Sequence, residues 1–138
     1  MRRAAVPLLL TTLACGPGDP DSAADAPAVE AAYGERFDLG LGARADVVGF
    51  RVTFTRIVEE SRCPRGARCV QVGNAAAAFA VESDAGSATL TLHTGREPRG
   101  VAVMGRALRL IELRPHPEEG APPDSSAYVA TLIVELAP

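Results

Sequence analysis

The sequence predicts an all-β domain, an antiparallel β-sandwich of about seven strands. Three observations lead to this fold class. From residue 37 onward apolar side chains alternate with polar ones, turn-forming residues interrupt the pattern at intervals of about ten, and no long stretch has the 3.6-residue period of a helix. An immunoglobulin-like strand order is one arrangement that fits, and a small barrel is the alternative.

The first predicted strands lie on either side of a cysteine-containing loop. Residues 37–41 and 48–55 have an apolar residue at every second position, as in a strand with one buried face. A third strand covers residues 69–82, and its apolar phase switches across Gly73 and Asn74, which suggests a β-bulge. We interpret the run of four alanines inside this strand as extended, because Val, Phe and Gly flank it.

The remaining strands follow a predicted hairpin. Residues 83–87 have the sequence Ser-Asp-Ala-Gly-Ser, which supplies turn residues and leads into a strand over residues 88–93. Later strands are predicted at residues 101–103 and 106–113. The last covers residues 128–136, where every second side chain is apolar.

Residues 1–14 are predicted to be an export signal. Arg2 and Arg3 precede an uncharged, mostly apolar stretch that ends at Cys15. This stretch is shorter than the roughly 20 apolar residues that a membrane-spanning helix needs. The junction before Cys15 resembles the bacterial lipobox, with Thr12 where that motif more often has Leu. The resemblance implies that Cys15 is lipidated and begins the mature protein; the alternative is an ordinary secretory signal cut near Ala14.

The expected organisation is therefore a signal peptide, a lipid-anchored tether and one domain. Residues 15–34 are rich in Pro, Asp, Ala and Ser without apolar periodicity, which is typical of a flexible tether. Residues 35–138 would form the β-sandwich. More than one acyl chain holds a protein firmly to a membrane. Gly16 after the cysteine resembles the default sorting signal, which implies the outer membrane in a Gram-negative host.

The charge balance bears on possible partners. Without Arg2 and Arg3 the chain keeps 12 basic and 17 acidic side chains, a formal net charge of −5. An acidic protein is poorly suited to bind nucleic acid or anionic lipid head groups. We therefore expect a membrane contact through the N-terminal lipid, and a partner that is an envelope protein, a glycan or a small ligand.

Cys63 and Cys69 are predicted to form a disulfide. They lie six positions apart across a loop with Pro and Gly, in a chain with an export signal. Closing a loop of about seven residues contributes roughly 2.4 kcal/mol by the chain-entropy estimate. Cys15 is then left for lipidation, so each of the three cysteines has a role.

The cysteine loop also carries a family resemblance. Its Glu60-Ser61-Arg62-Cys63-Pro64 segment, followed by Cys69-Val70-Gln71-Val72-Gly73, resembles a group of small bacterial exported proteins and lipoproteins of unknown function. These proteins show an acidic-Ser-Arg-Cys-Pro segment and then Cys-x-Trp-x-Gly. The chain departs from the pattern at Gln71, where the group usually has Trp. The resemblance implies export and an all-β fold, and it implies no reaction.

The cysteine loop has two alternative interpretations, a redox pair and a protease-binding loop. The spacing is longer than the C-x-x-C of redox motifs, although Arg62, Arg65 and Arg68 would favour a thiolate. A disulfide-closed loop that exposes Arg65 or Arg68 could also bind a trypsin-like protease as a substrate mimic.

Metal binding is the next alternative. Its weak candidates are His93, His116 and Met104 together with the two loop cysteines, and they show no ligand spacing within one element. We expect both histidines to be solvated surface residues, and we expect neither a metal nor another cofactor.

We expect no enzymatic activity. Neither histidine lies in a recognisable nucleophile motif, and adjacent carboxylates such as Glu59 and Glu60 point opposite ways on an extended chain. The leading hypothesis is a binding or structural module of the cell envelope, because loops on a rigid β scaffold commonly carry function. Its candidate binding loop contains Arg62, Arg65, Arg68 and Gln71. An envelope metal-binding or redox protein, or a protease-inhibitor-like loop, is the alternative.

Overall fold

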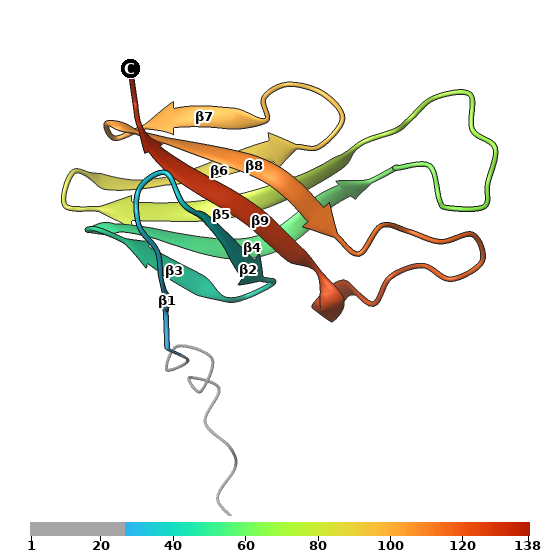
Figure 1. The fold of residues 1–138 in the computed structure, drawn as a ribbon, viewed down its shortest axis with the longest axis horizontal. Coiled ribbons are helices and arrows are strands. Elements are labelled where there is room, and N and C mark those ends of the chain that lie inside the picture. Colours follow the sequence, from blue (N-terminus) through green and yellow to red (C-terminus); the bar gives the residue numbers. More distant parts are fainter. Residues whose placement is uncertain (1–26) are drawn as a thin grey trace, which may run out of the picture.

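The fold is an all-β sandwich, observed in a computed structural model that describes residues 27–138 (Figure 1). One sheet has the strand order β1-β3-β4-β5-β6 and the other the order β2-β9-β8-β7. The strands are β1 (Val29–Glu30), β2 (Arg36–Gly40), β3 (Arg44–Val47), β4 (Phe50–Glu60), β5 (Ala75–Ser83), β6 (Gly86–His93), β7 (Gly100–Val103), β8 (Arg106–Arg114) and β9 (Val129–Leu136). All neighbouring strands are antiparallel except β1 and β3. The predicted fold class is confirmed.

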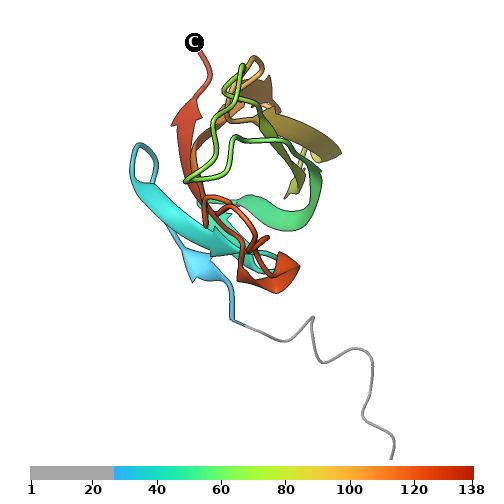
Figure 2. The ribbon, with the colours of Figure 1, turned by 90° about the vertical axis from the view of Figure 1, so that its right-hand side faces the viewer.

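The strand order is that of a meander. From β3 to β6, and again from β7 to β9, strands that follow one another in the chain are also neighbours in a sheet. The chain passes between the sheets after β1, after β2 and after β6, and β9 pairs with β2. Viewed from one end, the two sheets wrap around a shared interior (Figure 2). The order therefore differs from the Greek-key order of an immunoglobulin domain.

The core lies between the two sheets and follows the predicted alternation. In β2 and β9, buried residues occupy every second position. Phe54 and Phe79 are fully buried and stack with their ring centroids 5.1 Å apart. The largest fully buried side chains are those of Phe50, Phe54, Phe79, Leu39, Leu92, Leu108, Leu110, Leu132, Val47, Val52, Val81 and Val134.

The four alanines at the start of β5 are all buried, and they are extended as predicted. This strand lies between β4 and β6, so both of its edges are paired. On the outer face, Ala76 lies between Glu59 and His93 in the ladder, and Ala78 between Arg56 and Thr91. Small side chains at these positions leave room for the longer neighbours to cover the strand.

The prediction that a strand begins at Val48 is wrong. Val48 and Gly49 form the turn between β3 and β4, closed by the pair of Val47 with Phe50. Both turn residues have positive φ, 43° and 76°, as a two-residue type I′ hairpin requires. Val48 is 68% exposed. A branched side chain is unusual at such a turn position. Because Val48 also continues the alternation of Phe50, Val52 and Phe54, the sequence alone placed it in the strand.

The third predicted strand begins too early. Residues 69–74 are outside β5, which starts at Ala75, and Val70 and Val72 are exposed. Instead, residues 72–74 run back along residues 61–63, with the Cys63 N–H donating to the Val72 carbonyl at 3.0 Å. The predicted bulge at Gly73 and Asn74 is therefore absent. The register shifts of the two sheets lie in β4 and β8.

The five-stranded sheet extends further toward the N-terminus than the predicted domain boundary. Strand β1 pairs Val29 with Ala45 and Glu30 with Asp46. These two residues fall within the segment predicted to be a tether. The first paired residue is thus Val29, six positions before the expected start of the domain at residue 35.

Candidate functional site

Three loops gather at one end of the sandwich, which we call the long-loop end. They are residues 61–74 between β4 and β5, residues 94–99 between β6 and β7, and residues 115–128 between β8 and β9. Figure 1 shows the first and the last of them projecting together beyond the strands, far from the place where the described chain enters beside β1. The turns at the opposite end are short.

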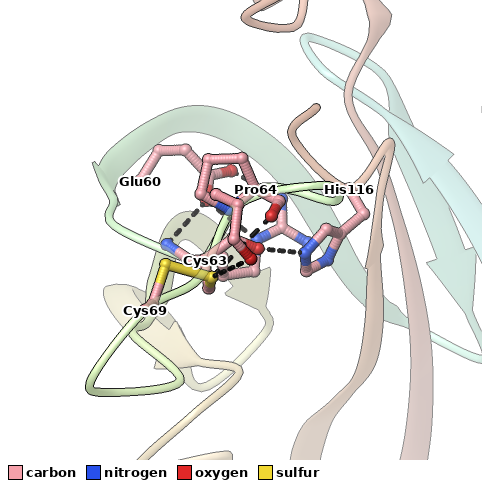
Figure 3. Close-up of a disulfide and its surroundings, with 7 residues drawn as sticks. Glu60, Cys63, Pro64, Cys69 and His116 are labelled. Carbon is pink, nitrogen blue, oxygen red and sulfur yellow. Dashed lines mark hydrogen bonds and ion pairs between the residues drawn. A yellow bond between two sulfur atoms is a disulfide. The ribbon is translucent and has the colours of Figure 1, made fainter. Parts of the chain in front are cut away.

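The predicted disulfide is present. Cys63 and Cys69 are joined with an S–S distance of 2.12 Å and a Cα separation of 5.9 Å (Figure 3). Within the ring, the Ala67 N–H donates to the Pro64 carbonyl at 3.1 Å. The ring therefore forms a short covalently closed turn at the tip of the first long loop.

The two long loops are hydrogen-bonded to each other. The Arg65 N–H donates to the Pro117 carbonyl at 2.9 Å, and the Glu119 N–H donates to the Arg65 carbonyl at 3.0 Å. Figure 3 shows the His116 ring directed at Cys63, where its Nε2 donates to the Cys63 carbonyl at 2.8 Å. The disulfide ring thus holds both loops in one arrangement.

A buried ion pair fixes the base of these loops. Arg62 is 9% exposed. Its Nε and Nη2 donate to the two Glu60 carboxylate oxygens at 2.8 and 2.5 Å. Its Nη1 and Nη2 also donate to the carbonyls of Leu113 and Pro115 at 2.7 and 3.0 Å. The Tyr128 hydroxyl donates to Glu60 at 2.9 Å.

The surroundings of Glu60 lower the pKa of its carboxyl group. Burial by itself would raise this pKa, but the hydrogen bonds from Arg62 and Tyr128 and the charge of Arg62 outweigh burial. Burial, followed by the hydrogen bond to Glu60, raises the pKa of the Tyr128 hydroxyl. Glu60 therefore stays ionised at neutral pH, and its charge is matched by that of Arg62.

A second polar cluster joins the first loop to residues 94–99. The amide of buried Asn74 lies 3.1 Å from Glu59 Oε2 and 3.0 Å from His93 Nδ1, and its Oδ1 accepts from the Gly95 N–H. Ser61 Oγ lies 2.9 Å from Glu59 Oε1. Hydrogen bonds from Ser61 and Asn74 lower the pKa of the Glu59 carboxyl. This cluster is a structural crosslink among three segments.

Gly73 makes the close approach of these segments possible. A Cβ at this position would lie 1.8 Å from the Ser61 carbonyl oxygen, well inside contact distance. Its φ of 74° is also in the left-handed region that favours glycine. Residue 73 therefore has to be glycine for the two strands of the loop to pack together.

A groove of about 580 Å³ lies between the first long loop and the end of β8. Its lining combines apolar side chains with charged ones on the rim. The lining residues are Arg62, Arg65, Val72, Gly73, Thr94, Gly95, Ile111, Glu112, Leu113, Arg114, Pro115, His116 and Glu118. A concave, partly apolar site with a few charged groups is the usual form of a ligand-binding site.

The residues of the predicted binding loop separate into two groups. Arg62 is buried and structural, so it is not on the surface where the sequence placed it. Arg65, Arg68 and Gln71 are exposed. Sequence reasoning missed the exposed pair Val70 and Val72, because their alternation was assigned to a strand. It also missed Glu60 and Tyr128, which are far apart in the chain.

The weak metal candidates are not brought together. Met104 lies in the turn between β7 and β8, where its sulfur is 3.3 Å from Ser83 Oγ, whereas His93 and His116 are at the long-loop end. Both histidines are partly buried and hydrogen-bonded rather than freely solvated. Among residues 27–138, no three His, Cys, Asp or Glu side chains form a group that could hold a metal ion.

The predicted signal peptide, the lipidation site Cys15 and most of the tether lie outside residues 27–138. Within that range no helix has the length and apolar character needed to cross a membrane.

Fold and site together define a class: small β-sandwich domains in which a disulfide ring fastens two long loops around a groove. No protein-family model, curated protein or solved structure matches the chain. The case for function therefore rests on the chain's own residues.

Proposed function

We propose that this protein is a lipid-anchored, non-catalytic binding module of the bacterial cell envelope. In this proposal Cys15 carries the lipid, and the long-loop end contacts a protein, glycan or small ligand. The observation that carries the proposal is the groove of about 580 Å³, whose walls are held in place before any ligand arrives. A binding site that is already ordered loses less entropy when it binds.

Exposed apolar side chains beside the groove also support binding. Val70 and Val72 are 104% and 84% exposed, and they lie one and three positions after Cys69. Exposed apolar residues that gather on an otherwise polar surface can mark an interaction site. The described chain enters beside β1, away from this end (Figure 1). An anchor at Cys15 would therefore leave the long loops free to reach a partner.

The polar clusters favour binding over catalysis. The Ser61 hydroxyl lies against Glu59 and the Asn74 carbonyl, at 2.9 Å from each. His93 Nδ1 faces the Asn74 amide, and Arg96 Nε lies 3.4 Å from the same His93 Nδ1. The base within reach of Ser61 is the Glu59 carboxylate, which also accepts from Asn74 and Arg96, so these groups are engaged with one another in a structural crosslink.

Photo-crosslinking in cells that make the full chain tests the proposal. A photoreactive amino acid at position 72 should give a defined adduct, whereas the same amino acid at position 48 should give none. Val48 is a matched control, because it is an exposed valine in a turn at the opposite end. Equal adducts from both positions, or none from position 72, would contradict a binding role for the long-loop end.

A Cys15→Ser variant should lose incorporation of labelled fatty acid, and continued incorporation would refute the anchor.

A further inference from the structure

We infer that the groove at the long-loop end binds an extended peptide segment through a carboxylate group, which Arg65 receives. This inference rests on the proposed binding function and specifies its ligand. It combines three features: one cation that has no partner among residues 27–138, the β8 edge beyond Arg109, and apolar side chains that line the groove.

Of the three arginines that line the groove, Arg65 is the available one. The charge of Arg62 is matched by Glu60, and Arg114 Nη2 lies 2.7 Å from the carboxylate of Asp38. Among residues 27–138, the exposed guanidinium of Arg65 has no hydrogen bond or ion pair. Only the backbone of Arg65 is engaged, by the second long loop. The backbone of Arg65 is therefore held beside the groove, and its guanidinium donors are free for a carboxylate.

Acidic side chains near Arg65 should repel a bound carboxylate. Glu118 lines the same groove, and within the described part of the chain it forms no ion pair with Arg65. Glu112 Oε2 lies 3.9 Å from Arg114 Nε, but Arg114 is paired more closely with Asp38, so the charge of Glu112 is only partly balanced. A carboxylate bound at Arg65 should therefore be opposed by Glu118 and Glu112 of the lining and by Glu119, whose carboxylate lies beside Gly66.

The edge of β8 favours a peptide over a compact small acid. Strand β7 pairs with β8 only up to Arg109, and β8 continues to Arg114 with β9 on its other side. The Leu113 carbonyl, on the side away from β9, accepts from Arg62. In an antiparallel strand the N–H of a residue points to the same side as its carbonyl. This edge therefore directs the Leu113 N–H away from β9, where it can donate to a carbonyl of an extended peptide, whereas the Leu113 carbonyl is already held by Arg62.

The groove also supplies apolar contact. Val72 is exposed at the rim, and Ile111, the extra residue at the register shift of β8, also lines the groove. An extended peptide directs alternate side chains to opposite faces. One apolar side chain of the peptide can thus contact Val72 and Ile111 while an acidic neighbour or the C-terminal carboxylate reaches Arg65.

Selection of a displayed random heptapeptide library on the immobilised, oxidised protein tests this inference. One library presents free C-termini and a second presents the heptapeptides internally, so the two sources of a carboxylate are distinguished. We expect enriched peptides that contain Asp or Glu next to an apolar residue, or that need the free C-terminus. Enrichment of basic or uncharged peptides, or no enrichment, would overturn the inference.

Three variants then measure the charge dependence with a synthesised selected peptide. R65Q should weaken binding about tenfold, because a charge-assisted hydrogen bond is lost. E118Q should strengthen it, and R56Q should leave it unchanged, since Arg56 is an exposed arginine on β4 away from the groove. Equal affinity for R65Q and the wild type would refute the role of Arg65. If crosslinking from position 72 succeeds while this series fails, the binding function stands and only its acidic-peptide ligand is wrong.

Discussion

Arg62 follows Glu60 and Ser61 in a loop, and loop arginines are ordinarily solvated. The sequence therefore placed it among surface binding residues. In the structure its guanidinium reaches two carbonyls more than fifty positions away in the chain, at Leu113 and Pro115. Nothing local in the sequence specifies such contacts, whereas the alternation that buries Phe54 or Leu132 is local and was predicted correctly.

Removing the Arg62 side chain should destabilise the protein strongly. R62M should lower the free energy of unfolding by about 3 kcal/mol, because it leaves Glu60 partly buried without its countercharge. R65Q is the matched control and should change this free energy by less than about 0.5 kcal/mol. Urea unfolding of the oxidised proteins measures both. If R62M and R65Q lowered the free energy of unfolding equally, the buried ion pair of Arg62 would contribute no more than an exposed arginine.

The lowered pKa of Glu60 gives stability a pH dependence. A carboxyl group whose folded pKa is lower than its ordinary value of 4.5 stabilises the fold above that value, and this contribution is lost as the pH falls through the folded pKa. E60Q should therefore have a lower Tm than the wild type at pH 7, and the difference should shrink by pH 3.

Thermal unfolding of both proteins across this range checks the prediction for Glu60. Other carboxyl groups with lowered pKa, such as those of Asp38 and Asp46, act equally in the two proteins and cancel in the difference. A Tm difference that is constant from pH 7 to pH 3 would contradict the prediction.

The strands were predicted correctly except where valines, which are typical of strands, lie in a turn or a loop. Val48 lies in a turn with positive φ, a position usually taken by Asn, Asp or Gly. Val70 and Val72 alternate like strand residues, yet the disulfide ring and Gly73 turn this segment back along residues 61–63. The alternation of apolar residues indicates which side chains could share a buried face. It does not indicate how a disulfide ring redirects the chain.

The disulfide ring should be the main source of stability in the first long loop. Replacing both cysteines, C63S with C69S, should lower the free energy of unfolding by about 2.4 kcal/mol. The groove should also lose order, since Cys63 and Arg65 hold the second loop. Urea unfolding and hydrogen exchange at residues 115–128 measure the two effects. Unchanged exchange in that segment would show that the second loop does not depend on the ring.

For the whole molecule, the sequence was sufficient for the class of fold and insufficient for the order of the strands. A two-residue period gives each strand a buried face, and such strands can pack as several sandwiches with different connections. The choice of a meander depends on contacts between distant strands, such as the pairing of Arg36 with Ile133. These contacts leave no mark on local periodicity.

The shared interior makes the whole sandwich sensitive to its aromatic centre. F54A should lower the free energy of unfolding by about 3 to 5 kcal/mol, because it leaves a cavity beside Phe79 between the two sheets. L136A is a suitable control, as Leu136 is 66% exposed at the end of β9. Calorimetry should show one unfolding transition, whose Tm is lower for F54A and unchanged for L136A. Separate transitions for the two sheets would contradict a single cooperative core.

The pairing of β2 with β9 has a consequence for the timing of folding. One sheet joins a strand near the start of the described chain to its last strand, and β8 also depends on β9. A chain that emerges N-terminus first cannot complete this sheet until β9 has followed. A nascent chain would thus remain unfolded on that side until its last strand has been made.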